Sequence, residues 1–322
     1  MKHLSLIVLT LLGLSAPLRA QQDEIFSHYM FNSFALNPGY AGLAGAPEFV
    51  GITRSQWLGY GGLGNGSPTT YNLTFNAPIL ALNSGAGINL IHDRLGPFVV
   101  NKAYASYAYH LVIGKGKLGI GARAGVMLLG IDRSDFIPPE TQDDITIYGD
   151  DDAQAKPDFA VGLWYETEKY YVGTSANHLT QPKYDFLSND SISLARANPA
   201  AVHGYVTGGY HFDPTYSLRV TPSALLRYDF ESGEAQVEVS AVGVYDEQIL
   251  GGLSFRQGEA IVAMVGFFML KDKNLRFNYA FDYTTVGRDA KAPTSHEVMV
   301  TYRLPAPVPG AKPIIRTPRY RH

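Results

Sequence analysis

The feature that most restricts the fold of this chain is a repeated alternation of apolar and polar residues, in segments of roughly ten residues. The clearest segment is 275–284, in which Leu275 and Phe277 alternate with Arg276 and Asn278. Successive side chains of a β-strand point to opposite faces, so this pattern predicts a strand with one apolar and one polar face. Similar segments, separated by turn residues, follow one another along most of the chain.

A water-soluble β-sandwich would show the same alternation, but three features favour a membrane barrel. The polar faces carry whole charges, which suit a wet lumen: Arg123, Arg219, Arg227, Glu238, Arg276 and Asp282. The apolar faces end in aromatic residues, as at the two interfaces of a membrane barrel: Tyr107, Tyr109, Tyr165, Tyr210 and Tyr228. Finally, both long connections, 131–156 and 178–200, follow odd-numbered strands, whereas most connections after even-numbered strands are tight.

No segment after residue 20 is a candidate transmembrane helix, because the longest apolar stretch is Ala260 to Leu270 and a spanning helix needs about 20 residues. A closed barrel is the other structure that satisfies its backbone in lipid. We therefore predict an all-β fold, a transmembrane antiparallel up-and-down barrel of about 14 strands over residues 47–304, with periplasmic termini. The predicted strands lie near 48–57, 68–78, 85–93, 99–112, 117–130, 157–166, 169–178, 201–212, 216–228, 234–245, 248–256, 260–270, 275–285 and 295–304.

Residues 1–20 are predicted to be a secretory signal peptide, since a short basic start is followed by an apolar run and Ala20. The absence of cysteine excludes a lipid anchor at the cleavage site, disulfides and thiolate metal sites.

Residues 21–46 do not alternate. Phe26, Tyr29, Met30 and Phe34 are spaced to share one helical face, before Asn37-Pro38-Gly39-Tyr40 forces a turn. We expect a short helix and turn in or against the periplasmic mouth, a plug segment; the alternative is a loosely ordered lead-in.

Two further segments carry unbalanced charge. The proline-rich tail, residues 305–322, has four basic side chains and no acidic one, so it is either disordered or a docking peptide for a periplasmic partner. The connection 131–156 is rich in Asp. Calcium could bind there, but the spacing matches no calcium loop and a solvated acidic loop is the simpler interpretation.

The sequence offers no pattern for catalysis, so we predict that the protein is not an enzyme and that it has no cofactor or metal site. Gly114-x-Gly116-x-x-Gly119 opens a predicted strand rather than a helix and therefore does not form a dinucleotide site. His92-Asp93 is interpreted as part of a hairpin turn rather than as catalytic residues of a barrel hydrolase. A net charge of −3 gives no basic surface for nucleic acid.

Several motifs together resemble the PorP/SprF family. They are Gln22-Asp23-x-x-Phe26-Ser27-x-Tyr29-Met30-Phe31-Asn32, Asn37-Pro38-Gly39-Tyr40-Ala41-Gly42 and Arg54-x-Gln56-Trp57, with Asp93-x-x-Gly96-Pro97, Tyr107-x-Tyr109 and Gly116-Lys117-Leu118-x-x-Gly121 further on. The resemblance is densest between residues 22 and 130.

This resemblance implies an outer-membrane barrel of the type IX secretion and gliding machinery. Such a barrel supports export or surface attachment of specific cargo, such as adhesins, by binding a C-terminal sorting domain. The implied partners are secreted cargo, periplasmic secretion or gliding components and outer-membrane lipid. The motif residues that we take as candidate partner-binding residues are Phe26, Tyr29, Phe31, Asn37, Pro38, Tyr40, Arg54 and Trp57.

The second hypothesis is a passive or substrate-specific pore for small solutes. An occluded lumen and a copurifying protein would favour the secretion component, whereas an open lumen with steady conductance would favour the pore.

Overall fold

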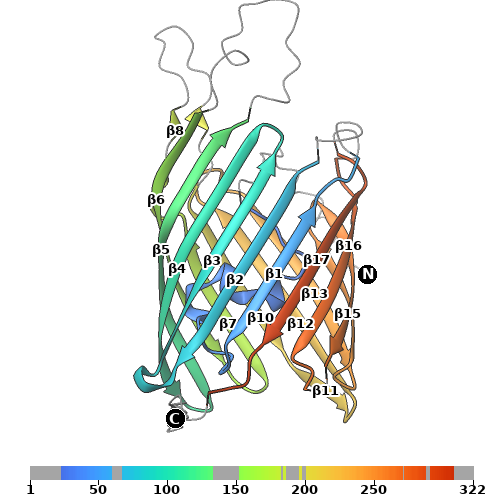
Figure 1. Ribbon diagram of the computed structural model, residues 1–322. Helices are drawn as coiled ribbons and strands as arrows, with labels where there is room; N and C mark the ends of the chain where they lie inside the picture. The colour runs from blue at the N-terminus through green and yellow to red at the C-terminus, as the bar shows by residue number, and fades with distance from the viewer. Residues whose placement is uncertain are drawn as a thin grey trace, which may run out of the picture.

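The computed structural model describes residues 23–59, 67–132, 152–182, 184–185, 196–197, 201–270, 272–287 and 291–307. Within these ranges 14 antiparallel strands close into a barrel, with one short extra strand (Figure 1). The barrel strands are β1 (Glu48–Ser55), β2 (Thr69–Ile79), β3 (Ser84–Leu95), β4 (Phe98–Ile113), β5 (Gly116–Ile131), β6 (Asp152–Glu166), β7 (Tyr170–Asn177), β10 (His203–Tyr210), β12 (Leu218–Asp229), β13 (Ala235–Tyr245), β14 (Ile249–Arg256), β15 (Ala260–Met269), β16 (Leu275–Thr284) and β17 (Thr294–Arg303). The predicted fold class and strand number are confirmed.

Pairing of β1 with β17 and of β10 with β12 closes the sheet. The extra strand β11 (Phe212–Thr215) pairs with β12, and β8 (Tyr184–Asp185) and β9 (Arg196–Ala197) form a separate two-stranded sheet. In the part of the chain that the structure describes, no helix has the length and apolarity needed to span a bilayer.

The strand β15 shows how the alternation positions the two faces of the wall. Ile261, Val265 and Phe267 point outward and are about half exposed, whereas Val262 and Met264 point inward and are buried. Large apolar side chains exposed to water would be unfavourable, but facing lipid they are in their preferred medium.

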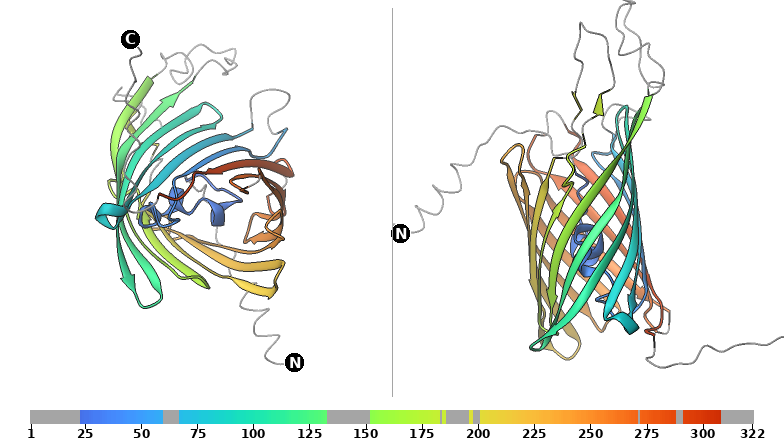
Figure 2. Two further views of the ribbon diagram at one scale, coloured as in Figure 1. Left: turned by 60° about the horizontal axis from the view of Figure 1, so that its bottom comes forward. Right: turned by 90° about the vertical axis from the view of Figure 1, so that its left-hand side faces the viewer.

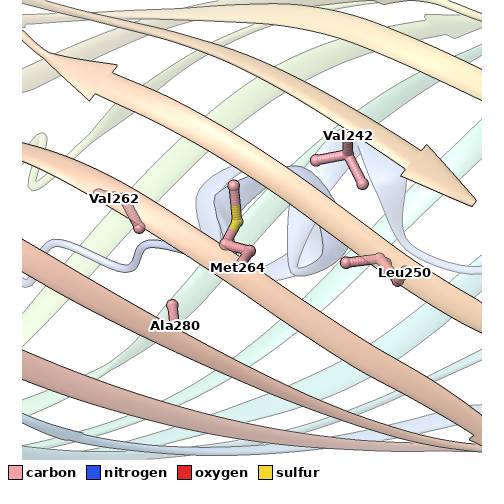
Figure 3. Close-up of a cluster of buried hydrophobic side chains, with 5 residues drawn as sticks. All are labelled: Val242, Leu250, Val262, Met264 and Ala280. Carbon is pink, nitrogen blue, oxygen red and sulfur yellow. The ribbon is translucent and has the colours of Figure 1, made fainter.

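The lumen is less uniformly polar than the charged positions predicted. On β13 to β16, five inward-facing apolar side chains form a cluster: Val242, Leu250, Val262, Met264 and Ala280 (Figure 3). Met30 and Phe31 of the N-terminal segment pack against this cluster. An apolar inner wall is stable here because protein, rather than water, covers it.

The connections are of unequal length at the two ends of the barrel. Those after β5 and β7 are the long ones, and because the strands are antiparallel both leave from the same end (Figure 1). We call it the long-loop end and the opposite one the short-turn end. Because β5 reaches Ile131 and β6 starts at Asp152, the first connection is shorter than the predicted 131–156. Residues 133–151, with most of its acidic side chains and the possible calcium site, lie outside the described residues.

The N-terminal segment, residues 23–46, runs inside the barrel (Figure 2). It contains η1 (Tyr29–Phe31), the single-turn helix α2 (Ser33–Leu36) and η2 (Pro38–Tyr40); the other short helix, η3 (Leu80–Leu82), connects β2 and β3. The predicted common helical face is wrong. Asn32 and Asn37 have non-helical backbone angles and interrupt the helix.

The wall surrounds this segment, so its side chains pack in different directions. Phe26 contacts the cluster around Met299, Tyr29 contacts Tyr205 and Leu225, and Phe34 packs on Ala108. The predicted signal peptide, residues 1–20, and most of the tail, residues 308–322, lie outside the described residues.

We predict that a charge on the outer wall destabilises the barrel according to its depth in the bilayer. Val265→Arg, at the middle of β15, is expected to lower the free energy of unfolding in lipid vesicles by about 2–4 kcal/mol. Met269→Arg, on the same outer face at the end of that strand, is the matched control, with an expected loss of about 0–1 kcal/mol. Denaturant unfolding monitored by tryptophan fluorescence measures both, and equal losses would contradict a membrane-facing wall.

Candidate functional site

The most distinctive part of the molecule is the contact between the N-terminal segment, here called the plug (residues 23–46), and the inner wall. Three groups of interactions hold it. They are a buried ion network, a charged latch near the long-loop end, and a set of close backbone contacts on β3, β5, β6 and β7.

The ion network joins side chains from six strands in one chain of contacts. In order they are Arg227 on β12, Glu238 on β13, Arg256 on β14, Asp282 on β16, Arg54 on β1 and Glu297 on β17. The shortest ion pairs are 2.8 Å, between Arg54 Nη2 and Asp282 Oδ2 and between Arg256 Nε and Glu238 Oε2. These side chains are almost inaccessible to solvent, so removing one partner would leave a buried charge unpaired and cost about 3–5 kcal/mol.

The plug enters this network through Ser27 and His28. The Ser27 backbone N–H donates to Glu297 Oε2 at 2.8 Å, and its hydroxyl donates to Asp282 Oδ1 at 2.8 Å. His28 Nδ1 lies 2.7 Å from Glu297 Oε1. The wall carboxylates therefore bind the plug as well as the wall arginines, and the ion network orders both.

The latch consists of Asp23 and Glu24 of the plug with Lys102, Asp158 and His178 of the wall, and it lies near the long-loop end. Lys102 Nζ on β4 is 3.0 Å from Asp23 Oδ1 and 2.8 Å from Glu24 Oε1. His178, directly after β7, places Nε2 3.0 Å from Asp23 and Nδ1 2.6 Å from Asp158 on β6. The latch thus ties the first described residues of the plug to β4, β6 and the end of β7.

Charge and burial oppose each other in the latch. Burial alone would lower the pKa of His178, but the carboxylate of Asp23 and the hydrogen bonds to Asp158 and Asp23 raise that pKa to about 9. Burial raises the pKa of Glu24 to about 7, with Lys102 opposing the shift. At Asp23, Lys102 and His178 outweigh burial and hold the pKa well below its usual range. The latch therefore pairs an imidazolium with an ionised Asp23 at neutral pH.

The second half of the plug lies directly against the backbone of the wall. Asn37 Nδ2 donates to the carbonyls of Leu163 on β6, at 2.9 Å, and Thr174 on β7, at 3.0 Å. Several wall positions that face this half are glycine, and an added β-carbon would overlap the plug at Gly85, Gly119, Gly121 and Gly162. The overlapping plug atom is the carbonyl oxygen of Gly39 at Gly119 and the side-chain oxygen of Asn37 at Gly162. Glycine is thus required on the wall by close approach.

Aromatic packing completes this half. The Tyr40 ring meets Trp164 edge-on, with centroids 5.1 Å apart, and Trp164 stacks on Tyr171 at 5.1 Å. Such contacts add specific geometry to the apolar area that is buried.

The predicted lumen charges divide into three groups: the ion network, two arginines that contact the plug, and Arg219 at the rim. Arg227, Glu238 and Asp282 meet in the ion network. Arg123 instead donates to the plug carbonyls of Phe34 and Ala35.

Arg276 lies over the Phe31 ring, 4.4 Å from its centroid. Arg219 is exposed at the short-turn end, where its Nε is 2.7 Å from Asp213 Oδ1. The alternation along β12 predicts that Arg219 is on the inner face of the wall, but it does not predict how far along the barrel axis Arg219 lies.

The candidate partner-binding residues also divide. Six of them, Phe26, Tyr29, Phe31, Asn37, Pro38 and Tyr40, belong to the plug and face the inner wall. Arg54 belongs to the ion network, whereas Trp57 lies at the long-loop end with Lys291 Nζ 4.7 Å from its ring centroid. Arg256 and Glu297 were missed as site residues, although both stand at inward positions of their strands.

Among the described residues no group of three or more His, Asp or Glu is arranged to hold a metal ion. A cavity of about 30 Å³ lies between the latch and the wall, lined in part by Asp23, Glu24 and Lys102. It has room for about one water molecule.

Comparison with known proteins gives one family. Residues 18–302 match the family described as type IX secretion system membrane protein PorP/SprF. No curated protein sequence matches the chain.

Among solved structures the chain resembles three barrels. They are the Acinetobacter baumannii outer membrane protein Omp33 (9% identity, 82% of this chain and 100% of that chain, TM-score 0.45), a deltaS2S3 mutant of the TodX monoaromatic hydrocarbon channel (11%, 84% and 94%, 0.46) and a Pseudomonas aeruginosa FadL homologue (12%, 80% and 89%, 0.41). At these values the likeness supports no statement about function.

We predict that a side chain at the plug-facing glycines loosens the plug. Gly119→Ala is expected to lower the free energy of unfolding by about 1–3 kcal/mol, because its methyl group would overlap the Gly39 carbonyl. The control is Gly251→Ala on β14, where an added β-carbon would contact nothing. Thermal unfolding of both variants in detergent measures the difference, and the expectation fails if the two variants unfold alike.

The latch predicts a specific pH dependence. The pKa of His178 is raised from 6.5 to about 9, so its stabilisation is fully present below pH 6.5 and is lost as the pH rises through 9. His178→Gln should therefore lower the melting temperature at pH 6 by an amount equivalent to roughly 1–3 kcal/mol, and by much less at pH 10. Melting curves of both proteins across this range test the expectation; a difference independent of pH would show that the charge of His178 is not what stabilises the latch.

Proposed function

The chain belongs to the PorP/SprF family of type IX secretion system membrane proteins, and on that premise we propose that it is a closed outer-membrane barrel that binds exported cargo rather than a diffusion pore. The cargo would be a surface protein, such as an adhesin, recognised through its C-terminal sorting domain. The long-loop end would face the cell surface, and the basic tail, residues 305–322, would lie in the periplasm near secretion or gliding components.

The observation that carries this proposal is the plug. Residues 23–46 occupy the lumen (Figure 2) and bind the wall through the ion network, the latch and the glycine contacts. Ser27 and His28 are completely buried, as are Asn37 and Gly39 further along the plug. Opening a solute pathway would break buried ion pairs, which is strongly unfavourable.

A solute pore is the second candidate. In its favour, the charged lumen wall has the composition that a water-filled channel needs. Against it, the charged side chains of that wall are bound to one another or to the plug rather than to water.

The first test joins two measurements on the wild-type protein. Purified barrels in planar bilayers should show no steady conductance, because the plug fills the lumen. Gentle detergent purification from the native host, followed by mass spectrometry, should recover a large exported surface protein in stoichiometric amount.

Trimming residues 133–150 and 186–195 tests whether that recovery depends on the long-loop end. Weaker recovery of the cargo from the trimmed barrel, with the barrel still folded, is expected. A bare barrel that conducts ions steadily would overturn the proposal in favour of the pore.

A further inference from the structure

The barrel wall is not equally high on all sides. Strands β3, β4, β5 and β6 rise past the others at the long-loop end (Figure 1). The β5–β6 ladder runs from Asp152 to Glu166, whereas the β6–β7 ladder starts at Val161. Among the described residues, the upper part of β6 is therefore paired with β5 and has no strand on its other side.

The lower part of this open edge is closed by neighbouring groups. The Phe159 carbonyl accepts from the Leu179 N–H at 3.0 Å, and the Phe159 N–H donates to its neighbour Asp158 at 2.8 Å. Pro157 has no N–H, and its carbonyl accepts from the Thr180 hydroxyl at 2.9 Å. These contacts also fix the parity: odd-numbered residues of β6 direct their backbone groups to the open side.

Above Pro157 two more residues of this parity lie on the edge. Ala153 and Ala155 have the same parity and are exposed, and their backbone groups on the open side make no hydrogen bond within the described ranges. The chain turns away from β6 after the end of β7, where His178 and Gln181 adopt left-handed backbone angles, with φ of 59° and 45°. Such angles are unfavourable for side chains larger than glycine, so this departure is imposed by the surroundings rather than by local preference.

The inner face beside this edge is apolar and already holds one aromatic side chain. Met127 and Leu129 on β5 are buried beneath Tyr184, whose hydroxyl donates to the Met127 carbonyl at 2.9 Å. Lys156 stands on the same face of β6 and forms no ion pair within the described residues. Within the part of the chain that the structure describes, the edge thus combines unpaired backbone groups, an inner wall that packs an aromatic side chain, and an ammonium group that forms no ion pair.

We propose that the free upper edge of β6 binds an extended strand of the exported protein by β-sheet extension. Ala153 and Ala155 supply the backbone hydrogen bonds, and Lys156 pairs with a carboxylate on the incoming strand. This inference rests on the proposed function and names the place where the cargo binds. An extended strand fits better than a helix, since strand edges bind other strands through their backbone groups.

The test uses the purified C-terminal sorting domain of a surface protein exported by the same cells, added to the full-length barrel in lipid nanodiscs. Hydrogen exchange should slow at least 10-fold at the amides of Ala153 and Ala155 when the domain binds. Ala155→Pro removes one open-side N–H without touching the β5 ladder and should weaken binding at least 10-fold. Ala155→Thr keeps that N–H and should bind as the wild type does.

Each outcome is decisive. If the domain binds but neither the exchange rates nor Ala155→Pro affinity changes, the edge is not the site and the proposed function stands. If the wild-type barrel does not bind the domain, the proposed function fails and this inference with it. Protection of both amides before the domain is added would overturn the inference. Protection that does not depend on barrel concentration would show that the chain's own loops cover the edge. Protection that rises with barrel concentration would show that a second copy of the barrel covers it. Lys156→Glu should weaken binding of the domain even though the backbone hydrogen bonds of the edge are unchanged. Lys156→Arg keeps the positive charge and should bind the domain as the wild type does.

Discussion

Backbone amides in the hydrocarbon core of a membrane have no water to bond to, and the rest of this structure depends on how the chain satisfies that requirement. The two ends of the sheet are joined: β1 pairs with β17 from Glu48 to Ser55, and β10 pairs with β12. Closure creates one face for lipid and another that encloses a space. Most of the charged side chains in the middle of the strands are then directed into that space, and they must find partners there.

The plug supplies binding partners for the inner wall, and its two halves do so by different kinds of contact. In the first half of the plug, Asp23 and Ser27 bind charges fixed on the wall. In the second half, Asn37 and Gly39 lie against Gly119, Gly121 and Gly162 of the wall, so that contact is by shape and backbone hydrogen bonds. The first mode responds to protonation and ionic conditions, whereas the second does not. One short segment is thus held by two anchors that fail under different conditions.

The sequence predicted those features that depend on neighbouring residues in the chain, and it did not predict those that depend on contacts between distant segments. Alternation is a local property, and it placed the strands within a few residues; the largest difference is β6, which begins at Asp152 rather than near 157. The same parity would have identified Arg256 and Glu297, but it does not give height, so Arg219 was expected in the lumen and lies at the rim. The helical spacing of Phe26 and Phe34 was misleading, because a segment surrounded by wall needs no single apolar face. The plug-facing glycines and the free edge of β6 depend on what lies opposite them, which sequence spacing does not record.

The plug also bears on the order in which the molecule is made. It precedes the first strand, and the buried Ala46 is separated from β1 by Pro47 alone, so there is no slack with which to thread the segment in later. The last strand of the sheet meets the first, across a sequence separation that makes this contact slow to form. We therefore expect the segment to lie inside before β1 and β17 pair, so that the wall closes around a core that is already in place.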